Sequence, residues 1–181
     1  LERLRGQGVR PKYIYTIPTI QNPTGTVMPL ERRHELLRLS AAFGVPVFED
    51  ECYADLLWEG DWPTALRGLP GGEQVIHIGS FSKSLAPALR LGYVNASWEV
   101  MRRLLSVKDD GGTPAIEQMI VADYFGRHFD AHVTTLKAGL RAKLAVLIEA
   151  VEQEFGTAAE LSVPKGGIFL WLSLPEAVDT G

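Results

Sequence analysis

The chain has 181 residues, of which 46% are hydrophobic, and its formal net charge is −4 at pH 7. This is enough chain for one substantial hydrophobic core. A slightly acidic composition is not typical of nucleic-acid-binding domains, which concentrate positive charge. No apolar run approaches the ~20 residues that a membrane span needs, and a single cysteine excludes a disulfide framework and favours a reducing compartment. We therefore expect an enzyme-like cytoplasmic domain that binds neither nucleic acid nor membrane.

Both ends of the chain resemble interrupted elements. Residues 1–6 are typical of the last turn of a helix that glycine ends. The chain closes shortly after Pro175, where another helix could begin. We interpret the chain as a fragment of a longer protein.

Short apolar runs and helical repeats alternate along the first half. Pro29 opens a helix that extends to Phe43, because leucines recur at helical spacing and Gly44 follows. The apolar runs predict strands at 13–16, 45–48, 75–78 and 91–94. Nearly continuous apolar strands joined through helices indicate an α/β fold, a mostly parallel sheet with helices on both faces.

The second half has longer helices and a predicted hairpin. Helices are expected at 97–107, from Thr113-Pro114 onward, and at about 132–155. Strands at 160–163 and 168–172 flank a glycine-containing connection at 164–167. The pattern predicts part of a large domain over residues 1–125, followed over 126–181 by a linking helix and the start of a small α+β domain.

Two loops that follow predicted strands carry candidate cofactor ligands, at the sheet edge where open parallel sheets bind ligands. The first contains Asn22 in the run Asn-Pro-Thr-Gly, which alone is also ordinary turn chemistry. The second contains Asp50, whose carboxylate could pair with a protonated ring nitrogen, and Tyr53, which could hydrogen-bond a ring hydroxyl. Taken alone, this loop is better explained as an acidic strand end with a packed aromatic side chain. Cys52 is interpreted as a small buried hydrophobe.

A third loop places Lys83 between hydroxyl side chains, shortly after the strand at 75–78. A lysine is a covalent catalyst when it can lose its proton and is held still. The cation of Arg90 and partial desolvation would both disfavour the ammonium form of Lys83. Ser80, Ser82 and Arg90 can hold a phosphate. A phosphate site beside a reactive lysine indicates pyridoxal phosphate, whereas a lone lysine here would be a solvated surface charge.

Together these loops resemble the fold-type I, pyridoxal-phosphate-dependent aminotransferases of class I/II. The similarity covers essentially the whole chain, through the segments 20–25, 80–83, 90–93 and 164–171. The run Ser-Phe-Ser-Lys-Ser-Leu-Ala-Pro with Arg-Leu-Gly-Tyr is most similar to the aminoadipate/kynurenine aminotransferase branch. It is also similar to the aminotransferase-like domain of GntR-type transcription regulators.

The resemblance implies a reaction and two chemical roles. Lys83 would form the internal aldimine and then move the proton between the substrate's alpha carbon and the cofactor. Asp50 would keep the pyridine nitrogen protonated. The implied reaction is reversible amino transfer between an amino acid and a 2-oxo acid, in a homodimer. A pyridoxal-phosphate-dependent lyase and a ligand-sensing regulator domain remain the alternatives.

The remaining roles implied by the resemblance are cofactor contacts. Asn22 and Tyr53 would hydrogen-bond the ring hydroxyl oxygen, and the phosphate would be anchored by Ser80, Ser82 and Arg90. The family's other phosphate loop and its ring-stacking aromatic would precede this chain, and its substrate-carboxylate arginine would follow it. The fragment alone is therefore expected to be inactive.

No metal site is expected. His128 and His132 have a helical spacing that could suit a metal, but no third ligand is evident.

Overall fold

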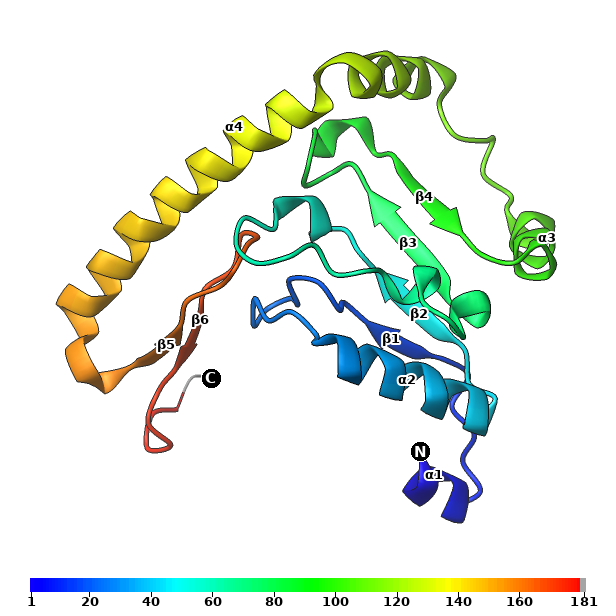
Figure 1. Ribbon diagram of the computed structural model, residues 1–181, viewed down its shortest axis with the longest axis horizontal. Coiled ribbons are helices and arrows are strands. Elements are labelled where there is room, and N and C mark those ends of the chain that lie inside the picture. Colours follow the sequence, from blue (N-terminus) through cyan, green and yellow to red (C-terminus); the bar gives the residue numbers. More distant parts are fainter. Residues whose placement is uncertain (180–181) are drawn as a thin grey trace.

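The computed structural model describes residues 1–179 and is built around a four-stranded sheet in the order β1-β2-β3-β4 (Figure 1). The first three strands are parallel to one another and β4 is antiparallel to β3. The bounds are Ile14–Thr16 for β1, Val47–Asp50 for β2, Ile76–Ser80 for β3 and Gly92–Asn95 for β4. The mostly parallel sheet predicted from the sequence is confirmed.

Each of these four strands begins one or two residues later than predicted. The shift is largest for β2, where the predicted strand started at Val45 and the observed one starts at Val47. Pro46 explains this difference, because proline has no N–H to donate to the strand ladder. The carbonyl of Pro46 instead accepts a hydrogen bond of 2.9 Å from the backbone N–H of Ile14.

Helix α2 (Leu30–Phe43) packs on one face of the sheet, after the short helix α1 (Glu2–Gly6). Its buried Leu37 joins a core cluster with Val47, Leu66 and Val75. Gly44 ends α2 in the left-handed conformation at φ 61°, as its position in the sequence predicted. The predicted helix is therefore confirmed.

Helix α4 (Ala115–Phe155) is one continuous helix of 41 residues that follows α3 (Trp98–Val107). We predicted two helices here, one from Thr113-Pro114 onward and one at about 132–155. In the structure Phe125 and Phe129 stack across Gly126 with ring centroids 3.8 Å apart, and Arg127 pairs with Asp123. Such contacts between residues four apart offset the cost of about 1 kcal/mol that glycine brings to a helix interior. The proposed domain boundary at 125/126 thus lies inside α4, and the division stays a prediction.

The C-terminal hairpin pairs β5 (Glu160–Ser162) with β6 (Trp171–Ser173). Its connection, residues 163–170, is longer than the expected turn and packs against the first part of the chain. The N–H of Gly167 donates to the carbonyl of Leu56 at 3.2 Å. A Cβ at Gly166 would lie 2.6 Å from both Ile20 and the Leu56 carbonyl oxygen, so only glycine allows this approach.

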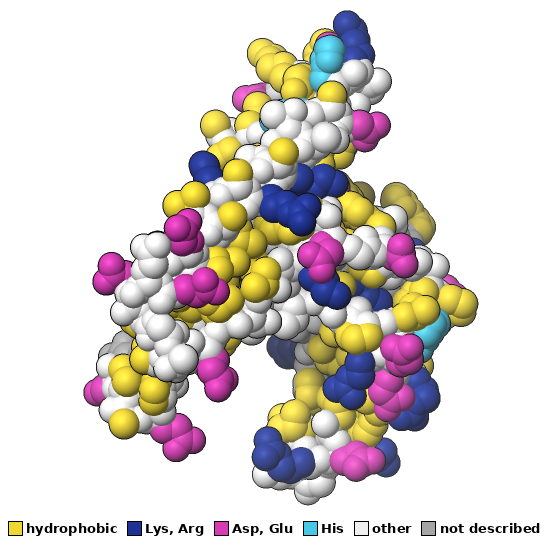
Figure 2. All heavy atoms as spheres, turned by 60° about the vertical axis from the view of Figure 1, so that its left-hand side comes forward, with side chains coloured by type: hydrophobic (Ala, Val, Ile, Leu, Met, Phe, Trp, Pro, Cys, Tyr) yellow, Lys and Arg dark blue, Asp and Glu magenta, His cyan; other side chains and the backbone are white. Residues whose placement is uncertain are grey.

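A second core cluster joins these parts beside the 3₁₀ turn η1 (Ala54–Leu56). It contains Ile20, Tyr53, Leu56 and Leu57, with Leu136 and Leu140 of α4 and Phe169 of the hairpin packed against it. Figure 2 shows hydrophobic side chains between α4 and the rest of the molecule. Within residues 1–179, none of the helices combines the length and apolar character that crossing a bilayer requires.

Arg33 of α2 is a fully buried cation at the centre of the first half. Its guanidinium also lies 3.5 Å from a Glu51 oxygen and 4.0 Å from a Glu49 oxygen, both at the end of β2. It donates four hydrogen bonds of 2.9–3.1 Å, to the carbonyls of Met28, Thr64 and Pro18 and to the hydroxyl of Thr19. One side chain therefore ties α2 to the segment before Asn22, to the loop after η1 and to the end of β2.

Replacing Arg33 by methionine should destabilise the protein by about 3–5 kcal/mol, because it leaves buried carboxylates without their cation. The measurement is urea unfolding of the full-length protein. Arg38→Met is the matched control, since Arg38 lies on the same helix but pairs with Glu35 in solvent, where an ion pair adds little. Equal unfolding midpoints for the two variants would contradict the central role of Arg33.

Candidate active site

The three loops singled out in the sequence meet at one edge of the sheet. Parallel pairing sets Thr16 beside Glu49 and Asp50 beside Ile78, so the carboxyl ends of β1, β2 and β3 lie together. In Figure 1 these ends point toward α4. The Asn22 loop, Asp50 and Lys83 all follow these ends, as expected for ligand binding by an open parallel sheet.

The Asn22 loop is closed by its own hydrogen bonds and reaches Tyr53. The N–H of Gln21 donates to the Thr26 carbonyl at 2.8 Å, and the N–H of Gly25 to the Gln21 carbonyl at 2.7 Å. The Asn22 amide donates to the Tyr53 hydroxyl at 3.5 Å. Burial raises the pKa of Tyr53, so its hydroxyl stays protonated at neutral pH. The structure thus brings two predicted ligands of one ring oxygen together.

Asp50 has a hydrogen-bond donor on each carboxylate oxygen. Oδ1 accepts the backbone N–H of Cys52 at 3.1 Å, and Oδ2 accepts the hydroxyl of Tyr15 at 2.6 Å. The sequence analysis missed Tyr15, because its partner lies 35 residues away. The only sequence signal was the alternation of β1, which places Tyr15 on the same sheet face as Phe48, its neighbour in register, and hence as Asp50.

Cys52 behaves as the inert residue that the sequence suggested. Burial, and next the negative charge of Asp50, raise the pKa of its thiol to about 12. The positive charge of Lys83 acts on the Cys52 thiol in the opposite direction.

The Lys83 loop is closed at its base and exposes the lysine. The N–H of Phe81 donates to the Leu91 carbonyl at 3.2 Å, and Ser80 stands opposite Gly92 in the antiparallel ladder. Ser82 and Arg90 therefore extend from the same end of this β3–β4 pair.

Two side chains of this loop have local contacts of their own. The backbone N–H of Ser82 donates to the Ser80 hydroxyl at 3.2 Å. The guanidinium of Arg90 donates to the Pro87 carbonyl at 3.2 Å. The first contact holds Ser80 and Ser82 together. The guanidinium of Arg90 is instead bonded within its own turn, to the Pro87 carbonyl.

These residues fit an anionic aldehyde cofactor by the chemistry of their donors. Two hydroxyls and a guanidinium at the β3–β4 end suit a phosphate dianion. A carboxylate at the end of β2 suits a protonated ring nitrogen, and the exposed amine of Lys83 directly follows Ser82 in the loop after β3. Within residues 1–179, no group of three or more His, Cys, Asp and Glu side chains is arranged to hold a metal ion.

Glu49 forms a buried network on the sheet face opposite Asp50, which the sequence did not reveal. It accepts backbone N–H groups of Leu66 and Arg67 and lies 2.9 Å from His77 Nδ1. Burial would raise the pKa of Glu49, but the hydrogen bonds from His77 and the two backbone groups hold it below its usual value. The hydrogen bond to Glu49 likewise raises the pKa of His77. His77 is therefore hydrogen-bonded to a buried carboxylate.

Glu51 is a buried carboxylate, and only one of its two oxygens has a hydrogen-bond partner among the described residues. Its side chain is 6% exposed; Oε1 accepts the Thr19 hydroxyl at 2.8 Å, whereas Oε2 has no hydrogen-bond partner among the described residues. Glu51, His77 and Tyr93 line a cavity of about 150 Å³. Burial raises the pKa of Glu51 to about 7, against the opposing hydrogen bond from Thr19.

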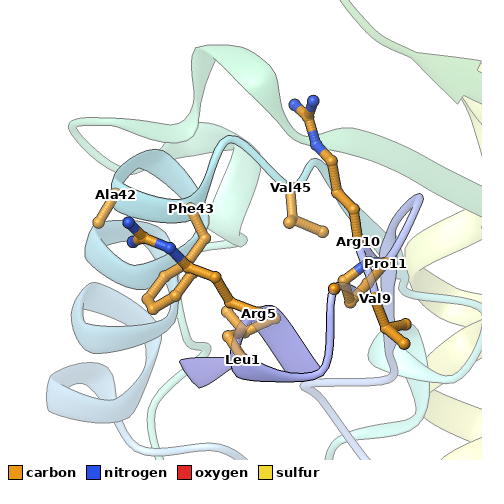
Figure 3. Close-up of a pocket in the computed structure, with 9 residues that line it drawn as sticks. Leu1, Arg5, Val9, Arg10, Pro11, Ala42, Phe43 and Val45 are labelled. Carbon is orange, nitrogen blue, oxygen red and sulfur yellow. The ribbon is translucent and has the colours of Figure 1, made fainter. Parts of the chain in front are cut away.

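A larger cavity, of about 310 Å³, lies at the other end of the strands (Figure 3). It is bordered by Arg5 and Val9, by Phe43 at the end of α2 and by Val45 before β2. Because it lies at the amino end of β2, it is separated from Asp50 by the length of that strand. We therefore assign the functional site to the opposite edge.

Glu51→Gln should change how stability depends on pH. The folded state holds the Glu51 proton up to a pKa of about 7, and the ordinary value is 4.5. Between these values the folded protein binds more protons than the unfolded one, so Glu51 makes stability fall as pH rises. The glutamine variant lacks this pH-dependent fall. Between pH 5 and 8 its free energy of unfolding should therefore rise relative to that of wild type, by roughly 1–3 kcal/mol.

Urea unfolding of the full-length protein at several pH values measures this difference. The exposed Glu59→Gln variant is the control and should run parallel to wild type. An unfolding free energy for Glu51→Gln that also runs parallel to wild type would contradict the raised pKa.

Comparison with known proteins adds a family to this geometry. The family model described as "Aminotransferase class I and II" matches residues 1–180. A 2-aminoadipate transaminase of Thermus thermophilus is 34% identical over 177 residues, which cover 93% of this chain and 44% of that protein. The uncharacterized HTH-type transcriptional regulator YisV of Bacillus subtilis is 31% identical over 88% of this chain and 34% of its own length.

A solved structure gives the same picture in three dimensions. The Pyrococcus horikoshii kynurenine aminotransferase, crystallised with PMP and its substrates and products, is similar with a TM-score of 0.92 and 30% identity. The match covers 99% of this chain and 45% of that one. The chain therefore spans less than half the length of the enzymes that it matches.

Proposed function

Because the chain belongs to the class I and II aminotransferase family, we propose that the protein containing it is a pyridoxal-phosphate-dependent aminotransferase. It would move an amino group between an amino acid and a 2-oxo acid. One observation carries this proposal: the Asn22–Tyr53 pair, Asp50 and the Lys83 loop gather at one edge of the sheet. The fold-type I architecture predicted from the sequence agrees with the matched family and with its solved structures.

Two residues would act at the reacting atoms. Pyridoxal phosphate supplies an electron sink for the substrate's alpha carbon when bound. The Lys83 amine would hold the cofactor in place and then carry the proton to and from that carbon. The Asp50 carboxylate, which faces away from Glu49 and Glu51, would hold a proton on the ring nitrogen.

Five residues would bind and orient. Asn22 and Tyr53 already share a hydrogen bond, so a ring oxygen could join both groups without a large rearrangement. Ser80, Ser82 and Arg90 would hold the phosphate through hydroxyl and guanidinium donors. Fixing the ring at both ends holds its reactive carbon at Lys83, which is how positioning lowers a barrier.

The assembly and location of the full-length protein are part of the proposal. We propose a cytoplasmic homodimer that does not bind nucleic acid through this segment. The proposal of a dimer is supported by large apolar side chains on the surface, since Trp98 of α3 and Ile116 and Met119 of α4 are 71–73% exposed. Light scattering by the purified full-length protein measures its oligomeric state, and a monomer would contradict the dimer.

Lys83→Ala in the full-length protein should abolish the absorbance of lysine-bound pyridoxal phosphate and all amino transfer, because Lys83 is the amine to which we assign both tasks. Absorbance spectroscopy of the loaded protein measures this loss. Lys12→Ala removes a lysine ahead of β1 and should leave the spectrum unchanged. Retention of the band in Lys83→Ala would refute the role of Lys83.

A ligand-sensing regulator is the second candidate, because the chain also matches an HTH-type regulator. Mixing the loaded full-length protein with single amino acids separates the possibilities. An aminotransferase should release the corresponding 2-oxo acid and leave the cofactor as its amine. A regulator should change its spectrum with little product, and a lyase should release products while the cofactor keeps its aldehyde form.

A further inference from the structure

Tyr15 of β1 holds the carboxylate that the proposed function assigns to the ring nitrogen. Its hydroxyl donates to Asp50 Oδ2 at 2.6 Å across the parallel β1–β2 pair. On the other oxygen, the backbone N–H of Cys52 donates to Oδ1 at 3.1 Å. A carboxylate with a fixed donor on each oxygen cannot rotate freely about its last bond.

From this geometry we propose that Tyr15 is a positioning residue for Asp50. It aims the carboxylate at the ring nitrogen and stabilises its negative charge. The inference rests on the proposed function, since it assigns no new reaction. Each carboxylate oxygen can accept two hydrogen bonds, so Oδ2 can receive both the Tyr15 hydroxyl and a ring N–H.

A tyrosine suits this task because it is a neutral donor. An arginine or lysine in its place would neutralise Asp50 and compete with the ring nitrogen for it. The Tyr15 hydroxyl supports the negative charge without cancelling it. Burial and the hydrogen bond to Asp50 raise the pKa of Tyr15, so it remains a donor throughout the physiological pH range.

The contact is not a by-product of core packing. The Tyr15 side chain is 54% exposed and Tyr13, two residues earlier on the same face, is 55% exposed. Tyr13 uses its ring instead, packing edge-on against Phe48 with centroids 5.0 Å apart. The chain thus offers two tyrosines of equal exposure on one strand face, of which Tyr15 is bonded to the carboxylate.

Tyr15→Phe in the full-length protein removes one oxygen atom and tests the proposal. The cofactor-free protein is titrated with pyridoxal phosphate. We expect its dissociation constant to be about 10-fold larger than that of wild type, as for the loss of one hydrogen bond to a charged group. The absorbance of the lysine-bound cofactor changes with pH, and the midpoint of this change should rise. The reason is that a ring nitrogen that holds its own proton less firmly repels a second proton on the bound cofactor less. For amino transfer, kcat should fall more than KM rises.

Tyr13→Phe is the matched control and should stay within about twofold of wild type in cofactor affinity, with an unchanged absorbance midpoint. Thermal unfolding of the cofactor-free variants shows whether both remain folded. If Tyr15→Phe folds and matches Tyr13→Phe in affinity and midpoint, the positioning role is overturned.

A double-mutant cycle with Asp50→Asn separates an effect through Asp50 from a general structural one. If Tyr15 acts through the charge of Asp50, Tyr15→Phe should have little further effect on affinity in the Asp50→Asn background. Full additivity would overturn the proposal. The proposed function fails separately, if the wild-type protein itself forms no lysine-bound cofactor band.

Discussion

The buried guanidinium of Arg33 is the constraint on which the site edge depends. It is fully buried and donates to three backbone carbonyls from three segments of the chain. A buried cation is tolerated only where its hydrogen-bonding capacity is filled. The segment before Asn22, the loop after η1 and the end of β2 must therefore keep their relative positions. The loops that we propose to bind the cofactor depend on this arrangement.

The end of β2 shows how three successive acidic residues acquire different properties. Glu49 and Glu51 point toward α2, whereas Asp50 points to the opposite face, because side chains alternate along a strand. Glu49 is held charged by His77 and two backbone donors, while Glu51 retains its proton more readily because burial dominates. Only Asp50 faces the half-exposed side on which Tyr13 and Tyr15 lie. The same acidic chemistry thus supports the fold on one face and offers the proposed cofactor ligand on the other.

Local patterns predicted much of the fold and the site. The leucine spacing and Gly44 predicted α2, because helix formation and helix ends depend on neighbouring residues. Asn22, Asp50 and Lys83 were singled out as candidates because each follows a strand of recognisable composition.

Partners distant in the sequence could not be found in this way. The role of Arg33 was not predicted, because its contacts with Pro18 and Thr64 arise from tertiary packing. The continuity of α4 was missed because the two helices were predicted separately, from Thr113-Pro114 onward and at about 132–155, whereas Phe125 and Phe129 stack between those segments in the structure.

The backbone at Arg90 bears on the phosphate contact that we propose for this side chain. Its φ is 52°, in the left-handed region that glycine occupies without strain. An arginine there costs about 1 kcal/mol or more, and such strain is often kept where a side chain has a task. The Lys83 loop thus carries the Arg90 guanidinium at a local energetic cost, which supports the proposed phosphate contact.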